Sequence, residues 1–253
     1  MEPFLELCSG YETDMKFITS AAKSHAPKEY ALSVIHPLDL RARLRNSNFN
    51  LEDHLPIRTT EDLLRYADDV AGSIASTICY LAWSILTSSS VRPIDDLAWS
   101  RSIHSKERST SLGPSERVRI VESAREMGQA LQLVNISRDV AKDATIGRLY
   151  VPLSAFPNGS EFLDVLIPPS SSPSYARYTL PLLDIADKLR QSSAPAMNEL
   201  PPTARGGTRA MAASYFEIAE EIRRRGGEIE ESGVKVKRWR RAWAAAGAMW
   251  GWS

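Results

Sequence analysis

The sequence has little of what several protein classes require. Two cysteines, Cys8 and Cys79, and four histidines without ligand spacing exclude a disulfide framework and a cysteine- or histidine-rich metal site. No apolar run reaches the roughly 18 residues of a membrane-spanning helix, and acidic Met1-Glu-Pro does not resemble a signal peptide. Basic and acidic residues number 31 each, which gives no overall field toward nucleic acid. We expect an intracellular protein, cytoplasmic or peripheral to a membrane, without a nucleic-acid partner.

Strand-like alternation is also almost absent, and helical periodicity dominates. Apolar residues recur at three- and four-residue steps, Thr60 can cap a helix, and Pro114 can open one. With 253 residues, the chain is near the upper size for one hydrophobic core. We therefore predict one all-α domain, a helical bundle over residues 1–253. The expected helices are 3–23, 61–86, 114–143, 177–197, 203–225 and 236–248, with irregular connections at 24–60, 87–113 and 153–176.

One helical stripe carries the strongest chemical signal. At about 100° per residue, Gln132, Asn135, Asp139 and Asp143 fall within roughly 80° of one another. Most charged helical stripes are solvated faces, but this one adjoins an apolar stripe, so its carboxylates lie on a largely buried helix and need a reason to be there. Mg²⁺ takes oxygen ligands and shares them with substrate phosphates. The pattern therefore indicates a magnesium site.

The segment QLVNISRDVAKDATIGRLYVP, residues 132–152, resembles the second aspartate-rich motif of the phytoene synthase/squalene synthase family of head-to-head prenyl transferases. Other segments follow in the family's order, so the resemblance covers nearly the whole chain and is closest to fungal phytoene synthase domains. It implies an isoprenoid-synthase-type helical bundle around a central cavity. The other matching segments are 3–7, 10–15, 66–74, 180–187, 213–218 and 236–243.

The resemblance assigns roles to individual residues. Asp139 and Asp143 would hold Mg²⁺, with Mn²⁺ as the alternative, against a prenyl diphosphate, and Tyr66 would lie near a carbocation. The implied reaction condenses two geranylgeranyl diphosphates to phytoene through a cyclopropyl diphosphate. The expected catalytic residues are Tyr66, Asn135, Asp139 and Asp143, and the expected substrate-binding residues are Val70, Ile74, Gln132, Arg138, Arg148, Tyr150 and Tyr215.

Several of these residues have a plainer interpretation. Arg138 can form an ion pair at the rim instead of binding diphosphate, and Tyr150 can be a core aromatic residue. Tyr66, Val70 and Ile74 follow i, i+4, i+8 spacing, which predicts one shared face, lining a tunnel or packing in a core.

Three acidic residues depart from the motif or match it weakly. Asp68 and Asp69 depart from the family pattern, and we favour a surface-facing pair over an Asp69 directed into the cavity. Asp14 matches a family aspartate and is a weaker candidate for the site. For Glu217 we expect an ion pair.

The family's first Asp-x-x-x-Asp motif has no counterpart here, because the chain begins at a later segment. We expect an N-terminally incomplete domain, about the C-terminal two-thirds of the family's, with apolar faces on helices 3–23 and 61–86 for covering helices or a fusion partner. Alternatives are a non-catalytic relative or assembly factor, a truncated fragment, and a squalene synthase-like enzyme with a nicotinamide reductant.

The C-terminal segment combines tryptophan and arginine. The stretch from Trp239 to Trp252 contains four tryptophans. Arg238 directly precedes this stretch, and Arg240 and Arg241 lie within it. We favour a terminal helix docked on the bundle with its basic residues outward. The alternative is a patch for peripheral contact with a membrane.

Overall fold

The computed structural model describes residues 2–22, 55–87, 112–157, 162–166 and 174–250. Every regular element in these ranges is helical, so the all-α prediction is confirmed. The elements are α1 (Glu2–Ala22), α3 (Thr60–Ala67), the π-helix η3 (Asp68–Gly72), α4 (Ser73–Thr87), α6 (Pro114–Thr145), η4 (Leu153–Ala155), α7 (Phe162–Leu166), α8 (Ala176–Ser193), η5 (Ala194–Glu199), α9 (Pro202–Arg224) and α10 (Arg238–Trp250).

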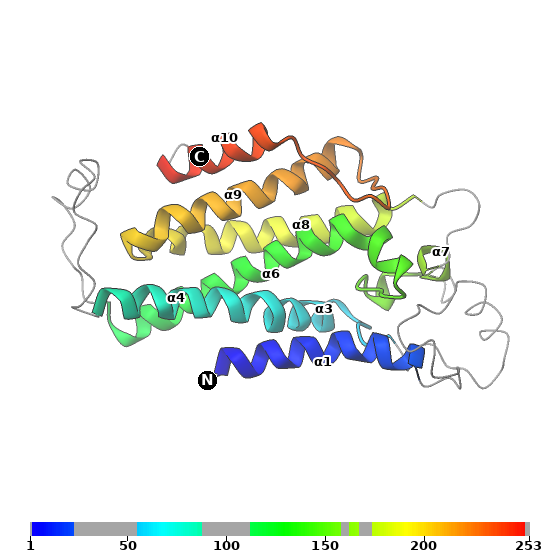
Figure 1. Cartoon of the computed structure of the whole chain (residues 1–253), viewed down its shortest axis with the longest axis horizontal. Helices are drawn as coiled ribbons and strands as arrows, with labels where there is room; N and C mark the ends of the chain where they lie inside the picture. Colours follow the sequence, from blue (N-terminus) through cyan, green and yellow to red (C-terminus); the bar gives the residue numbers. More distant parts are fainter. Residues whose placement is uncertain (1, 23–54, 88–111, 158–161, 167–173, 251–253) are drawn as a thin grey trace.

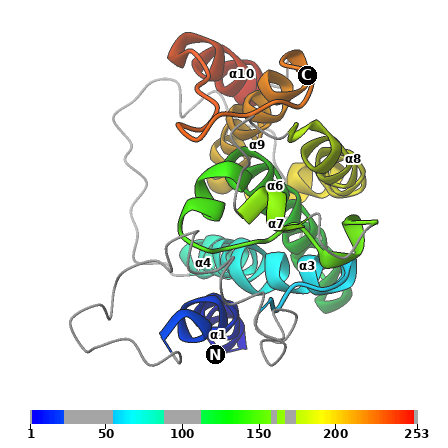
Figure 2. The same cartoon turned by 90° about the vertical axis from the view of Figure 1, so that its right-hand side faces the viewer.

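Helix α6 is the central element of the bundle. It packs against α4 and η3 on one side and against α8 and α9 on the other, as Figures 1 and 2 show from two directions. Helix α1 packs on η3 and α4 at one edge, and α10 packs on α9 at the opposite edge. Leu133 and Val134 of α6 are fully buried, as this position requires. The helix that carries the predicted acidic stripe is therefore the scaffold of the fold.

Local sequence signals set the helix boundaries. Thr59 accepts a hydrogen bond from the backbone N–H of Asp62, whose carboxylate accepts from the N–H of Thr59. The cap is therefore one residue earlier than Thr60, the predicted position. Pro114 opens α6 as predicted, and Gly147, with φ of 72°, follows its C-terminus in a conformation that favours glycine.

The helix formed by α3, η3 and α4 contains a π-turn where other helices come closest. A Cβ on Gly10 of α1 would lie 2.5 Å from Val70, and one on Gly128 of α6 would lie 2.5 Å from the carbonyl oxygen of Ala71. A π-turn holds one residue more than an α-turn and rotates the faces on its two sides relative to each other. The shared face predicted for Tyr66, Val70 and Ile74 therefore holds for Val70 and Ile74 but does not include Tyr66.

The predicted connections differ in their outcome. Helix α7 lies within 153–176 because Phe162, Val165 and Leu166 are buried, and Phe162 packs edge-on against Phe156 at 6.2 Å between ring centroids. The prediction of an irregular connection was wrong there. Residues 23–54 and 88–111, most of the other two predicted connections, lie outside the described residues.

Exposed apolar side chains occur on α1 and α4. Phe4, Leu5 and Tyr11 on α1 and Ile74, Tyr80 and Leu81 on α4 are exposed, which agrees with the apolar faces expected on these helices. In the part of the chain that the structure describes, none of the helices combines the length and the apolar character needed to cross a bilayer.

Candidate active site

An elongated apolar cavity of about 270 Å³ follows one face of α6. Its lining on α6 runs from Ile120 at one end to Gln132 and Asn135 at the other. Residues of η3, α4, η5 and α9 and the last residue of α8 supply the remaining walls. Val70 and Ile74 are among the lining residues, and Ile74 is 48% exposed at its open side. Gln132, Asn135 and Tyr215 are polar side chains of the lining near the acidic stripe, and Ser193 and Thr208 also line the cavity.

Asn135, predicted to be catalytic, and Tyr215, predicted to bind substrate, meet at the end of the cavity near the acidic stripe. The hydroxyl of Tyr215, from α9, donates to Oδ1 of Asn135 at 3.1 Å, and both side chains line the cavity together with Gln132. This bond joins α9 to α6 at the wall of the cavity.

The acidic pair lies one and two turns further along α6. Asp139 and Asp143 are half-buried, and burial together with the charge of Asp139 raises the pKa of Asp143 to about 6. Nε of Arg138 donates to Oδ1 of Asp139 at 3.0 Å, and Nη2 donates to Oδ2 at 2.5 Å. Arg138 therefore forms the ion pair that the plainer interpretation proposed, with a two-pronged geometry that also raises its own pKa.

Asp14 is the centre of a polar cluster that joins three segments of the chain. Tyr66 donates its hydroxyl hydrogen to Oδ1 of Asp14 at 3.0 Å, and Tyr150 donates to the same oxygen at 2.7 Å. The two rings stack with centroids 5.0 Å apart, and Nη1 of Arg148 lies 3.4 Å from the Tyr150 hydroxyl. Burial raises the pKa of both tyrosines above the ordinary value, so both hydroxyls stay protonated at neutral pH.

The structure thus separates Tyr66 from Val70 and Ile74, which sequence spacing placed together. Tyr66 is directed to Asp14 and Tyr150, whereas Val70 and Ile74 line the cavity beyond the π-turn. Asp14, the weaker candidate from the sequence, instead receives two hydrogen bonds at the cluster. Its only signal in the sequence was its place in the matching segment, because a 52-residue separation from Tyr66 leaves no local pattern.

The paired acids at 68 and 69 do not form a surface-facing pair. Arg125 of α6 donates from Nε and Nη2 to the carboxylate of Asp68 at 3.0 and 2.5 Å, and its Nη1 donates to Glu6 at 2.6 Å. Both Asp68 and Asp69 are half-buried, and neither lines the cavity. The prediction was wrong because Arg125, distant in sequence, neutralises this part of the helix.

Comparison with known proteins identifies this arrangement. A family model described as squalene/phytoene synthase matches residues 1–240. The chain belongs to the squalene/phytoene synthase family. The acidic pair on α6 lies within the matched part.

Similar proteins of this squalene/phytoene synthase family occur in fungi. A bifunctional lycopene cyclase/phytoene synthase of Phaffia rhodozyma is 31% identical over 249 residues, covering 87% of this chain and 30% of the relative. One of Arthroderma gypseum is 30% identical over 227 residues, covering 88% of this chain and 34% of the relative. The chain thus spans about a third of the length of these relatives.

A solved dehydrosqualene synthase has a TM-score of 0.48 and 20% identity to this squalene/phytoene synthase family member, covering 84% of this chain and 63% of the other. That likeness is too distant to place a site residue.

The acidic pair can hold a divalent cation if an anionic ligand completes the coordination. Among the described residues, no group of three or more acidic, histidine or cysteine side chains is placed to hold a metal by itself. Two carboxylates on one helix nevertheless suit Mg²⁺, which commonly uses one or two carboxylates with phosphate oxygens and water. Burial and the nearby negative charges of Asp139 and Asp14 raise the pKa of Asp143, and a bound cation would favour its ionised form.

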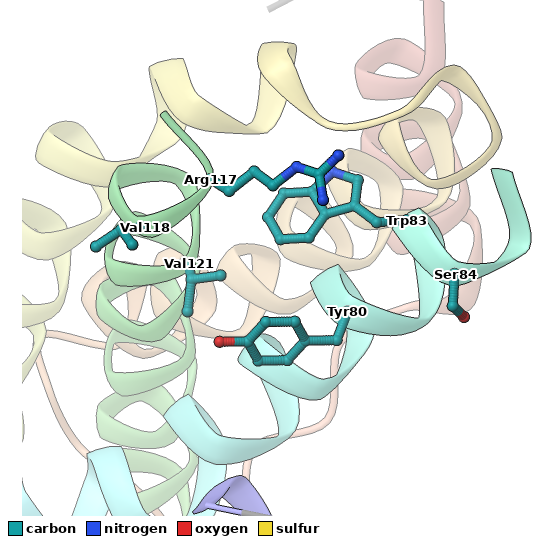
Figure 3. A pocket seen from close by; sticks show the side chains of 6 residues that line it. All are labelled: Tyr80, Trp83, Ser84, Arg117, Val118 and Val121. Carbon is teal, nitrogen blue, oxygen red and sulfur yellow. The ribbon is translucent and has the colours of Figure 1, made fainter. Parts of the chain in front are cut away.

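A second cavity, of about 290 Å³, lies between α4 and the first turns of α6, whereas the acidic pair lies in the last turns of α6. Figure 3 shows Arg117 extending from α6 across the indole of Trp83, with Tyr80 beneath, and the guanidinium lies 5.4 Å from the ring centroid. No acidic side chain among the described residues lines it, and its cation already packs on an aromatic face. In this family member it is a poorer candidate for a reaction site.

Proposed function

We propose that this chain is a phytoene synthase-like prenyl transferase, which joins two geranylgeranyl diphosphates head to head to give phytoene. One observation carries the proposal: a single face of α6 passes from an apolar cavity, through the amides of Gln132 and Asn135, to the carboxylates of Asp139 and Asp143. This arrangement suits an amphiphilic ligand. Its long apolar chain would occupy the cavity, and its anionic head group would share a bound cation with the carboxylates.

The dimensions are consistent with a prenyl chain. The 15 residue steps from Ile120 to Asn135 span about 22 Å of helix, and Asp139 lies one turn beyond. The cavity volume of about 270 Å³ is close to the lower limit of roughly 300 Å³ for ligand pockets. This volume suits one extended prenyl chain better than two. Ile74 of the lining is exposed, which would leave access for the prenyl chain of the second substrate.

The chemistry divides between the two ends of the site. Asp139 and Asp143 would hold Mg²⁺ or Mn²⁺, which when bound supplies positive charge to the departing diphosphate. Arg148 lies beside the Asp14 cluster and can pair with diphosphate oxygens. The apolar walls would exclude water from the allylic cation until the double bond of the second substrate attacks it. Asn135 and Tyr215, held to each other, would orient the reacting end.

After this first bond forms, loss of a proton closes the cyclopropane ring and gives the cyclopropyl diphosphate. This intermediate releases its diphosphate on ionising, rearranges and loses a second proton to give phytoene. Tyr66 and Tyr150 would act through position, because their hydroxyls are both committed to Asp14. Arg138 would exchange Asp139 for a diphosphate oxygen when the site fills, which reconciles its ion pair with a role in binding.

A second candidate is a relative that binds prenyl diphosphates without condensing them. It is favoured by the single Asp-x-x-x-Asp pair in the sequence and by the lack, among described residues, of a metal group with three acidic side chains. A squalene synthase-like activity has less support, because the fungal relatives are named as phytoene synthases.

The test is to incubate the purified chain with geranylgeranyl diphosphate and Mg²⁺ and to analyse the extract for phytoene. Phytoene formation that is lost in Asp139→Asn and retained in Asp164→Asn, an exposed carboxylate on α7, would support the proposal. A parallel reaction with a nicotinamide reductant tests the squalene-type alternative, since a reduced product would then appear. Binding of the diphosphate with Mg²⁺ but no product would support the non-catalytic candidate.

A further inference from the structure

Helix α10 presents a row of tryptophans to solvent. At about 100° per residue, Trp239, Trp243 and Trp250 fall within roughly 40° of one another around the helix. Their side chains are 60%, 68% and 69% exposed. Large aromatic side chains seldom remain this exposed together, so the row requires an explanation.

Two arginines on other sides of α10 fix the helix to the bundle. Arg240, about 100° around the helix from Trp239, donates to Glu217 at 2.8 Å and to Glu221 at 3.0 Å on α9. Nε of Arg241 donates to the hydroxyl of Ser214 on α9 at 3.1 Å. The ion pair expected for Glu217 is therefore confirmed, whereas the prediction that the basic residues all face outward was wrong. The tryptophans are outward instead, because α9 offers carboxylates rather than an apolar groove.

The segment with the exposed tryptophans is strongly basic although the whole chain has no net charge. Residues 235–250 contain no aspartate or glutamate and include Lys235, Lys237, Arg238, Arg240 and Arg241. Arg240 is neutralised by α9, but the other four side chains are exposed. Helix α10, which carries the exposed aromatic row and these cations, lies at one edge of the bundle (Figure 1).

We propose that α10 binds the surface of a bilayer that contains anionic lipids, with its axis in the plane of the interface. Tryptophan rings partition to the level of the headgroups, where the ring is in an apolar environment and the N–H remains hydrated. Lysine and arginine beside them pair with anionic headgroups, each contributing about 1 kcal/mol. A lipid surface fits better than a protein groove, because the rings are separated along the helix and the cations have no acidic partner on α10.

This inference does not depend on the proposed reaction. The test is co-sedimentation of the full chain with vesicles of phosphatidylcholine alone and of phosphatidylcholine with about 30% phosphatidylserine, a composition that carries the negative surface potential of anionic membranes. We expect the chain to sediment with the anionic vesicles, less so at high salt, with a blue shift of tryptophan fluorescence.

Two variants of α10 separate the aromatic and electrostatic contributions. Lys235→Gln/Lys237→Gln/Arg238→Gln should weaken binding to anionic vesicles roughly 100-fold, from three charges at about 1 kcal/mol each. Trp239→Ser/Trp243→Ser should weaken binding at least about tenfold and remove most of the blue shift. Both sets of side chains are exposed, so circular dichroism should show unchanged helix content.

Matched controls lie on the far edge of the bundle. Phe4→Ser/Tyr11→Ser removes exposed apolar side chains from α1, and Arg65→Gln removes an exposed cation from α3. Both should bind vesicles as the wild type does. A wild-type chain that stays in the supernatant with both vesicle types overturns the proposal. Equal losses in the α10 and control variants would overturn it as well.

Discussion

Tyr150 donates its hydroxyl hydrogen to Oδ1 of Asp14 at 2.7 Å, across 136 positions of the sequence. The bond joins α1 to the segment that leaves α6, directly after the acidic pair. Because Tyr66 donates to the same oxygen, one carboxylate holds three segments together beside the candidate site.

The first prediction concerns this carboxylate. Asp14→Ala should lower the free energy of unfolding by about 2–4 kcal/mol, because two buried hydroxyls lose their acceptor. Urea denaturation measures the change, and Glu12→Gln, an exposed acid on the same helix, is the control. If Asp14→Ala unfolds at the same urea concentration as the control, the cluster does not stabilise the fold.

The second prediction concerns pH. The pKa of Asp143 is raised to about 6, so the folded state binds its proton more tightly than the unfolded state, where an aspartate titrates near about 3.9. Stability should fall as pH rises through this window, and the full penalty should remain at neutral pH. Asp143→Asn should therefore be more stable than the wild type at pH 7.5, by roughly 1–2 kcal/mol after allowance for partial exposure, and equal to it near about pH 4.

Thermal melts at both pH values test this, with Asp164→Asn as the control that should show no such difference. The same titration predicts weaker binding of a divalent cation as the pH falls below about 6, because a metal competes with the proton for the carboxylate. A pH-independent gain of stability in Asp143→Asn would contradict the assigned cause.

The third prediction concerns the contact between α6 and the π-turn. Gly128→Ala should destabilise the fold by about 1–3 kcal/mol, because its Cβ would meet the backbone oxygen of Ala71 at 2.5 Å. Gly207→Ala on α9 has open space at that position and should stabilise the fold by about 0.5–1 kcal/mol. Denaturation midpoints that change in the same direction for both would refute the close packing.

The fourth prediction tests the orientation of the apolar cavity. Ala124 lines it about 16 Å along α6 from Asn135. Ala124→Leu should weaken binding of geranylgeranyl diphosphate roughly tenfold by filling the distal part, and should leave geranyl diphosphate nearly unchanged. Calorimetry with both ligands measures this, with Ala155→Leu on exposed η4 as the control. An equal loss of affinity for the two ligands would mean that the prenyl chain does not lie along Ala124.

Periodicity predicted the long helices well, because apolar residues of one helix report on its own buried face. It also placed the acidic stripe on α6 and identified the cap of α3 to within one residue. It failed at Tyr66, since a π-turn leaves no mark in a count of three- and four-residue steps. Arg125 was missed for another reason: its partners Asp68 and Glu6 are 57 and 119 residues away.

The two-pronged pair between Arg138 and Asp139 has a thermodynamic consequence. Asp139 already has Arg138 as its counter-ion, so a ligand that engages Asp139 must displace a guanidinium, which can then pair with the ligand's anionic group. Binding becomes an exchange of partners with little change in net charge. Ligand affinity at this site should therefore respond only weakly to ionic strength.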